Sequence, residues 1–283
     1  MSALQFLKQA VKSRWVFPMP TPLKSPTVKT LTEFTKLIED QLAASTNGIL
    51  WHRGCADFDN HHLSSSLYRH RTITAADELL KLEMEMITHF KQRSVPFVAR
   101  PLEDNHWERL FFMQHFEIPT RLLDWSENPF VALYFALSTK PDAGDPDAVI
   151  WMLDPVAWNR KSLDHISYTG GVLTVDDSLT DGYKPGANIA DMNTDSIAIY
   201  GFHNSPRIVA QRGVFTICGK DTVPMEAIYT NKNYPADSLI KVRIPKADKS
   251  SMLQSLFKVG FTHSVVYPDL AGLAKEMKHF FKF

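Results

Sequence analysis

The sequence predicts an α+β fold, because it mixes amphipathic helical segments with short apolar runs of strand character. Two capping signals, at Thr30 and Thr74, each precede apolar residues at helical spacing. The clearest strand candidate is the apolar run of residues 148–153, which lies between two prolines. With 283 residues, 44% of them hydrophobic, the chain can bury a sizeable core.

The first part of the chain predicts a helical extension, residues 1–45, ahead of one larger domain, residues 46–283. Residues 1–16 carry basic side chains among apolar ones without a continuous apolar core. This pattern indicates a short amphipathic helix and neither a signal peptide nor a membrane span. Four prolines within residues 16–26 then predict an extended connector.

Within the larger domain, a strand over residues 49–54 is expected to run into a glycine turn. Helices are expected at residues 74–90, 104–115, 128–137, 249–259 and from 270 onward. After the strand at 148–153, further strands are expected at residues 207–218, 238–244 and 261–267. Residues 158–201 show little periodicity, which predicts a long irregular insertion.

Composition limits the classes of partner. Thirty-one basic residues offset thirty-one acidic ones, so no overall field attracts nucleic acid or an acidic membrane. Two cysteines, Cys55 and Cys218, are too few for a secreted disulfide framework and predict a reducing, cytoplasmic setting. Glycine-rich phosphate loops, a nucleophile elbow and HExxH do not occur, which disfavours dehydrogenases, nucleoside triphosphatases, elbow hydrolases and zinc proteases.

Residues 115–136 combine ionisable groups, a proline turn and a dense apolar run, which predicts a strand-turn-helix corner with polar side chains at its edge. Thr120, Arg121 and Asp124 cannot all be buried without partners. One interpretation is an internal Arg121–Asp124 salt bridge, and the other is a direct role at a site. Thr120 and Ser126 are candidates for ligand contact, although Ser126 would alternatively cap the following helix.

Arg53 and Gly54 form a second candidate pair at a strand end. Arginine offers forked donors to phosphate oxygens, and glycine lets a ligand approach the main chain. The alternative is an Arg53 paired with Asp57 or Asp124, with Gly54 serving the turn. Several histidines and arginines lie in residues 52–71, which favours an anionic ligand there. They lack the spaced ligands of a zinc site, so no metal is expected.

Three motifs in order, Trp51-His52-Arg53-Gly54, residues 115–136 and residues 207–215, resemble the FRG domain family. The resemblance extends from about residue 49 to 281, and His52 holds the place of the family's first aromatic residue. FRG domains are similar to the ADP-ribosyltransferase fold. The resemblance therefore implies a split β-sandwich, in which two packed sheets form a cleft and helices cover its flanks.

The same resemblance implies roles for individual residues toward NAD as co-substrate. Arg53 would hold the pyrophosphate or ribose edge, Gly54 would read the carboxamide, and Gln211 would orient the sugar where such transferases often carry a glutamate. Tyr134 or Trp125 would lie against the nicotinamide. The expected catalytic set is Arg53, Gln211 and His115, and the expected NAD-binding set is Arg53, Gly54, Thr120, Arg121, Ser126 and Tyr134, with His115 and Arg121 supporting the cleft.

The resemblance thus implies an NAD-dependent ADP-ribosyltransferase acting as a toxin in a bacterial toxin–antitoxin or phage-defence system. RNA or protein is the expected acceptor, an antitoxin is an expected partner, and no membrane is. Because an amide cannot remove a proton, a central Gln211 requires another base or a good neutral nucleophile. Gln211 would alternatively be a structural tie. The rival functions are a noncatalytic phosphate- or nucleic-acid-binding module, and a nuclease using His115, Asp124 and nearby histidines.

Overall fold

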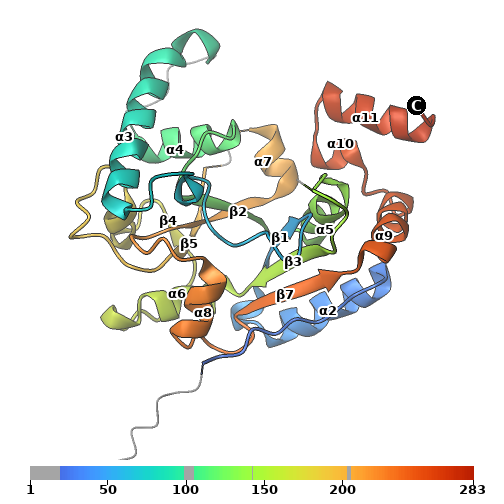
Figure 1. Cartoon of the computed structure of the whole chain (residues 1–283), viewed down its shortest axis with the longest axis horizontal. Coiled ribbons are helices and arrows are strands. Elements are labelled where there is room, and N and C mark those ends of the chain that lie inside the picture. Colours follow the sequence, from blue (N-terminus) through green and yellow to red (C-terminus); the bar gives the residue numbers. More distant parts are fainter. Residues whose placement is uncertain (1–19, 99–104, 142, 203–204) are drawn as a thin grey trace, which may run out of the picture.

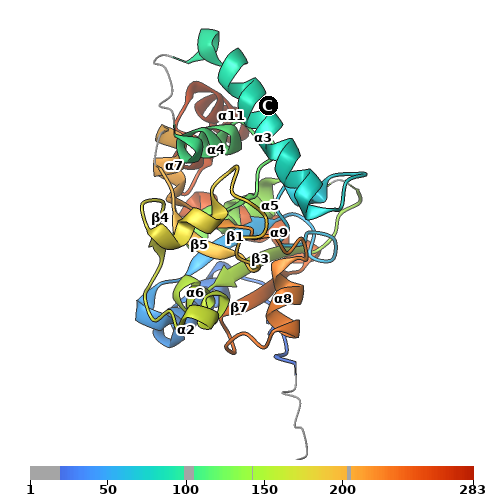
Figure 2. The same cartoon turned by 90° about the vertical axis from the view of Figure 1, so that its left-hand side faces the viewer.

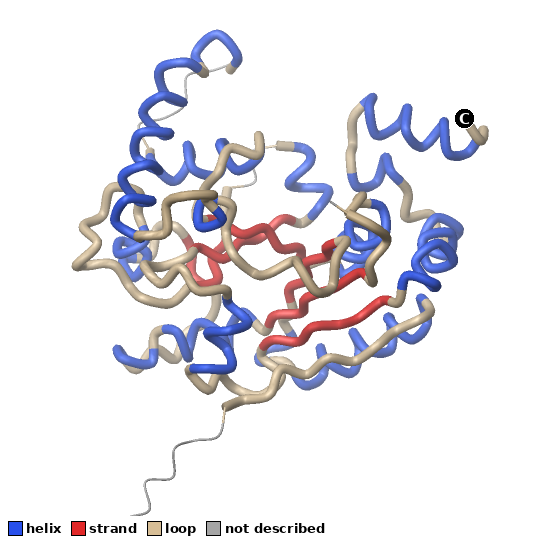
Figure 3. Tube along the Cα trace, in the orientation of Figure 1, coloured by secondary structure: helices blue, strands red, loops and turns tan. Residues whose placement is uncertain are grey.

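The computed structural model describes residues 20–98, 105–141, 143–202 and 205–283. Its described strands form one seven-stranded mixed sheet in the order β4-β5-β6-β2-β1-β3-β7, where only β4 and β5 pair in parallel. The strands are β1 Trp51–Cys55, β2 Leu122–Ser126, β3 Ala148–Leu153, β4 Leu173–Thr174, β5 Ile197–Tyr200, β6 Gly213–Ile217 and β7 Leu239–Ile244. The fold is therefore α+β, and the strands lie as a central layer between helices (Figure 3).

The sheet is almost divided at its centre. β1 pairs with β3 over five residues, and β2 pairs with β6 over five. Between β1 and β2, however, the register holds a single pair, His52 and Ser126. We expected two packed sheets from the sequence; the described strands instead form one sheet that is nearly split in two where β1 and β2 diverge.

Helices cover both faces of this sheet (Figure 1). They are α2 Leu31–Ala44, α3 Ala76–Arg93, α4 His106–His115, α5 Pro129–Ser138, α6 Pro155–Ser162, α7 Pro206–Gln211, α8 Met225–Asn231, α9 Lys246–Lys258, α10 His263–Val266 and α11 Leu270–Phe280. Short 3-10 turns are η1 Thr46–Gly48, η2 Leu67–Arg69, η3 Val95–Phe97, η4 Asp164–Ile166 and η5 Ser178–Tyr183. Figure 2 shows α3 slanting away from the sheet, with its start near the strands.

The core has three parts, set by the alternation of side chains along the strands. On one face, α2, α5 and α9 pack against β3 and β7. On the opposite face, α6 and α8 pack against β1, β2 and β3. A third cluster joins α3 and α4 to β5 and β6. The cavity described below opens where the first and third parts meet, beside the divergence of β1 and β2.

Most predicted elements are found, and the exceptions have local causes. At α2, Thr30 accepts a hydrogen bond from the Glu33 amide at 3.1 Å, which confirms the first capping signal. At α3 the cap is Ala75, so the signal at Thr74 was wrong. Segment 207–218 is not one strand, because helix α7 precedes β6, and segment 261–267 contains the one-turn helix α10 instead of a strand.

The predicted irregular insertion is more ordered than its composition indicated. Residues 158–201 contain the end of α6, the strands β4 and β5, and two 3-10 turns. Side chains supply this order: the Asn159 amide nitrogen donates to the Ala198 carbonyl at 2.9 Å, while its oxygen accepts from the Ala198 amide at 2.6 Å. The helix expected over residues 1–16 lies outside the described residues.

Candidate functional site

A cavity of about 240 Å³ opens at the divergence of β1 and β2, bounded by α4, α5 and α7. The strand register explains which residues of the sheet line this cavity. Residues paired directly across neighbouring antiparallel strands share a face, as do residues two apart along one strand. His52, Gly54, Asp124, Ser126, Gly213 and Phe215 thus share one face, and all of them line the cavity.

Seven residues selected from the sequence line this cavity together: Arg53, Gly54, His115, Asp124, Trp125, Ser126 and Gln211. They come from β1, the end of α4, β2 and the end of α7. Figure 1 shows α7 above the sheet between α4 and α10, and Gln211, its last residue, lines the cavity. Three distant segments of the chain therefore converge on one hollow.

Arg53 is held at the divergence itself. Its Nη1 donates to the backbone carbonyl of Asp124 at 2.7 Å. That carbonyl lies where β2 has no partner strand on the β1 side, so the guanidinium supplies the missing donor. Among the described residues no carboxylate lies within ion-pair distance of Arg53, so neither predicted pairing, with Asp57 or with the Asp124 side chain, is found.

His52 lines the cavity, although the sequence placed it only in the family motif and gave it no role toward a ligand. Its ring is only 2% exposed, and within the described chain neither ring nitrogen makes a hydrogen bond of good geometry, although the Ser126 backbone lies close to it. Burial lowers the pKa of His52 to about 4, although the backbone of Ser126 acts in the opposite direction. At neutral pH the ring is therefore neutral and offers one donor and one acceptor to the cavity. A buried polar ring needs a hydrogen-bond partner, and a ligand or a water molecule in the cavity can supply one.

We expect His52 to make stability depend on pH. Its pKa is about 4 when folded and near 6.5 when unfolded, so the unfolded chain takes up the proton first as the pH falls. The contribution of the neutral His52 ring to the free energy of unfolding is complete above pH 6.5. It is lost progressively as the pH falls toward 4, by up to about 3 kcal/mol. In urea unfolding, the free energy of unfolding of His52→Phe should fall less over this pH range than that of wild type. His89→Phe, at an exposed position, should decline as wild type does; parallel curves for both variants would contradict the assignment.

His115 ends α4 at the rim of the cavity. Burial and the nearby Arg207 guanidinium lower its pKa, while Asp124 raises it, so the net direction is downward from 6.5. The ring is thus mostly neutral at pH 7. A neutral imidazole can accept a proton, which suits the catalytic role expected from the sequence.

Ser126 and Gln211 are joined to each other. The Ser126 hydroxyl donates to the Gln211 carbonyl at 2.6 Å and accepts from the Asn128 amide at 2.9 Å. The N-cap of α5 is Asn128, so Ser126 does not cap that helix. The Gln211 side-chain nitrogen donates to the Val266 carbonyl at 3.1 Å. Gln211 is therefore a structural tie as well as a cavity residue, and its amide oxygen is the part directed to a ligand in our proposal below.

Three predicted NAD-binding residues do not reach the cavity. Thr120 and Arg121 are fully buried and Tyr134 is 1% exposed. The Tyr134 hydroxyl is hydrogen-bonded to His263, and Thr120 donates to Gln114. These three residues do not line the cavity and their polar groups are bonded inside the protein, so their contact with a ligand stays a prediction.

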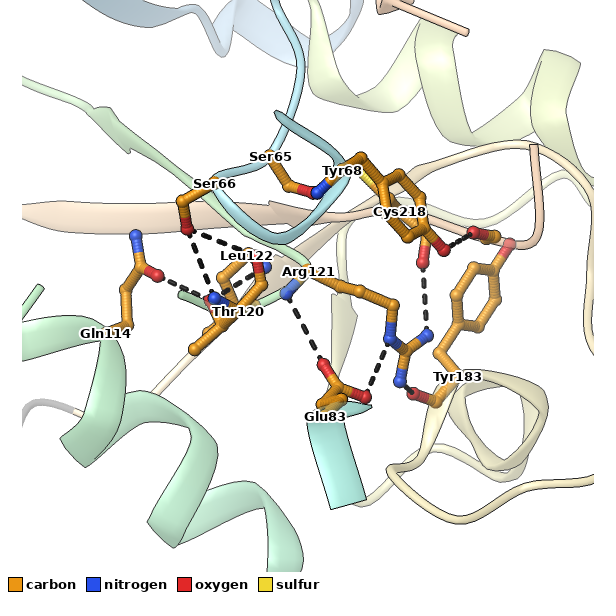
Figure 4. A network of polar contacts seen from close by, with 11 residues as sticks. Ser65, Ser66, Tyr68, Glu83, Gln114, Thr120, Arg121, Leu122, Tyr183 and Cys218 are labelled. Atoms are coloured by element: carbon orange, nitrogen blue, oxygen red, sulfur yellow. Dashed lines mark hydrogen bonds and ion pairs between the residues drawn. The ribbon is translucent and has the colours of Figure 1, made fainter. Parts of the chain in front are cut away.

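Arg121 also lacks its predicted partner. Its Nε lies 2.9 Å from a Glu83 carboxylate oxygen, and its terminal nitrogens donate to the carbonyls of Cys218 and Tyr183 (Figure 4). Asp124 is instead exposed and faces the cavity. The predicted Arg121–Asp124 bridge is replaced by a buried pair with a helix residue 38 positions earlier.

The structure adds cavity residues for which the sequence carried little signal. Gln114 lies on α4 beside His115. Arg207 is the second residue of α7, and its guanidinium lies over the Tyr267 ring, 5.0 Å from the ring centre. Phe111 and Phe215 form an aromatic wall, with ring centres 4.8 Å apart. In the sequence these side chains are indistinguishable from core or surface residues.

Other features bear on the class of site. Within the described ranges, no group of three or more histidine, cysteine or carboxylate side chains is arranged to hold a metal ion. His62 is instead bonded to Glu226 at 2.7 Å. No described helix is long and apolar enough to cross a membrane.

Residues 48–145 match the family model of the FRG domain. The matched segment contains β1, α3, α4, β2 and α5, and with them Arg53, Gly54, His115 and Ser126. It is shorter than the stretch of residues 49–281 suggested by the motifs, and it leaves β6 and Gln211 outside. Comparison of the chain with curated proteins and with solved structures finds no match.

Proposed function

We propose that this protein is an NAD-dependent ADP-ribosyltransferase. The observation that carries the proposal is the convergence of Arg53, His115, Ser126 and Gln211, from distant parts of the chain, on the cavity at the divergence of β1 and β2. The family resemblance implies an ADP-ribosyltransferase-like split β-sandwich, and a sheet held by one residue pair at its centre supports that relationship.

The size of the cavity favours one end of the dinucleotide. Small-molecule pockets commonly measure roughly 300–1,000 Å³, and this one measures about 240 Å³. We therefore assign it to the nicotinamide ribose end of NAD, with the rest lying along the mouth. The neutral, buried His52 ring would hydrogen-bond the ribose or the carboxamide, and Arg53 would attract the pyrophosphate.

Gln211 would orient the sugar during cleavage. The bond from NAD ribose C1′ to the nicotinamide nitrogen breaks with the electron pair leaving on nicotinamide, and positive charge develops on the sugar. An amide oxygen directed at the ribose would stabilise that charge and hold a hydroxyl. We also propose, from the family resemblance, that the protein is a toxin of a toxin–antitoxin or phage-defence system and that RNA or protein is the acceptor.

Labelled NAD tests this proposal. Purified protein is titrated with NAD by calorimetry and then incubated with cell extract that is separated into protein and RNA fractions. We expect binding and label transfer in wild type, with transfer reduced about 10²–10³-fold in Gln211→Ala and His52→Phe. Asp40→Asn, a change on the exposed face of α2, should leave transfer unchanged. Absence of NAD binding by wild type would refute the proposal.

A nuclease is the second candidate, because His115 and Asp124 line the same cavity and interact electrostatically. The same extracts, incubated without NAD, separate the two functions. RNA cleavage that is independent of NAD and lost in His115→Gln would favour the nuclease. Ligand binding without either reaction would indicate that the protein is a noncatalytic binding module.

A further inference from the structure

Asp124 is a carboxylate of the cavity that has no role in the transferase reaction proposed above. It lies in β2 two residues before Ser126, is exposed, and faces the cavity from the sheet. One of its oxygens, Oδ2, accepts a hydrogen bond from the Gln114 side-chain nitrogen at 2.6 Å. A carboxylate has two oxygens, so a second one is available for a ligand.

A chain of hydrogen bonds fixes the direction of this contact (Figure 4). The Thr120 hydroxyl donates to the Gln114 amide oxygen at 2.5 Å and accepts from the Leu122 amide at 3.1 Å. The Thr120 amide donates in turn to the Ser66 hydroxyl at 3.1 Å. Because Thr120 is fully buried, the Gln114 oxygen is held toward the core and its nitrogen toward Asp124. The carboxylate is thereby positioned by a buried network, as catalytic groups are.

The surroundings of Asp124 indicate which acceptor group fits there. Arg53 and Arg207 line the same cavity, and Arg53 is bonded to the Asp124 carbonyl. The Asp124 and Glu117 carboxylates of the same cavity balance these two guanidinium groups, so no net negative charge attracts a cationic lysine or arginine acceptor. A neutral hydroxyl needs no such attraction, and it is a weak nucleophile that needs a base.

We propose that Asp124 and Gln114 form an acceptor subsite for a hydroxyl group, in which Asp124 is the general base. The inference rests on the proposed transferase function. As nicotinamide leaves C1′ with the electron pair, the acceptor oxygen forms the new bond to C1′ and its proton passes to the Asp124 carboxylate. Gln211 then needs no basicity, because the base is supplied by the neighbouring strand. Gln114 is a positioning residue that acts through Asp124.

Two acceptors, methanol and azide, distinguish a base that acts on the acceptor from a residue that acts on the binding or cleavage of NAD. Methanol is a hydroxyl acceptor that must lose a proton, whereas azide is an anion and needs no base. With NAD and methanol, we expect Asp124→Asn to release nicotinamide about 10²–10⁴-fold more slowly than wild type. NAD affinity by calorimetry should stay within about threefold, which also shows that the variant is folded. With azide, wild type and Asp124→Asn should differ by less than about tenfold.

Gln114→Leu should slow methanolysis by about 10²-fold and leave the azide reaction near the wild-type rate, because only the position of the base is disturbed. The change Asp40→Asn is the matched control and should alter neither reaction.

Several results would overturn the inference. An unchanged rate of methanolysis in Asp124→Asn would show that Asp124 is not the base. Equal losses of rate with methanol and with azide would show that Asp124 acts on NAD and not on the acceptor. Wild type that binds NAD but releases no nicotinamide to methanol would exclude a hydroxyl subsite while leaving the transferase in place. Wild type that does not bind NAD would refute both proposals together.

Discussion

Replacing Arg121 with methionine is expected to lower the free energy of unfolding by about 3–5 kcal/mol, the cost of breaking a buried ion pair. The side chains of Arg121 and Glu83 are both fully buried. The substitution leaves the Glu83 carboxylate without its cation and removes the donors to the carbonyls of Cys218 and Tyr183. Urea unfolding at pH 7 measures the loss, with Arg71→Met at an exposed position as the control.

A double variant separates charge from hydrogen bonding. In Glu83→Leu with Arg121→Met the unpaired charge is gone, so we expect part of the stability to return. It should not return completely, since the carbonyls of Cys218 and Tyr183 still lack the donors they had, at about 1–3 kcal/mol each. Additive losses from the two single changes would show that the pair is not coupled.

The Arg121–Glu83 pair explains why part of the site could not be read from the sequence. Ionisable residues in a motif suggested contact with a ligand, but burial depends on which distant segments pack together. Arg121 joins α3, the start of β2, the end of β6 and the 3-10 turn at Tyr183. No local pattern specifies the partnership of Arg121 with a glutamate in a helix, because that helix position is selected only by the tertiary fold.

Several residues selected from the sequence do line the cavity. Arg53, Gly54, His115 and Ser126 were selected where a strand or helix was expected to stop, whereas Gln211 was selected from the family resemblance, inside an expected strand. The antiparallel register brings them together: Ser126 at the end of β2 pairs with His52, next to Arg53, and its hydroxyl donates to the Gln211 carbonyl at the end of α7. These residues therefore reach one cavity even though the expected strand at 207–218 was wrong. Helix α7 was missed because it ends at Arg212 in a left-handed conformation, with φ 45°, where glycine or asparagine would have been the usual signal.

His52 and Gln114 show a different limit. A histidine in an apolar strand is indistinguishable from an ordinary core residue until its ring nitrogens are seen to lack hydrogen bonds of good geometry. Gln114 gains significance only from its bonds to Asp124 and Thr120. Sequence patterns therefore located the edge of the site, whereas the side chains that complete it required the spatial arrangement.

Gly54→Ala is expected to be at least as damaging as the loss of Arg121. A Cβ built at Gly54 would lie 1.7 Å from the Ala132 carbonyl oxygen, 2.7 Å from the Ala132 carbonyl carbon and 2.8 Å from the Ala136 nitrogen. All three are backbone atoms of α5, so no side-chain rotation relieves the contact. The helix would have to move away from β1, at a cost of more than about 3 kcal/mol. The glycine is thus required by helix packing, which the prediction of a turn or a ligand contact did not include.

Gly171→Ala is the matched control, since no atom lies within 4 Å of the Cβ it would create. We expect its free energy of unfolding to stay within about 0.5 kcal/mol of the wild-type value. Ala132→Gly should not rescue Gly54→Ala, because the clash is with the carbonyl of residue 132 and not with its methyl group. Val131, Ala132 and Phe135 of α5 also line the cavity. Any folded fraction of Gly54→Ala should therefore bind NAD more weakly than wild type, and wild-type stability with unaltered binding would show that β1 and α5 are not in the close contact described.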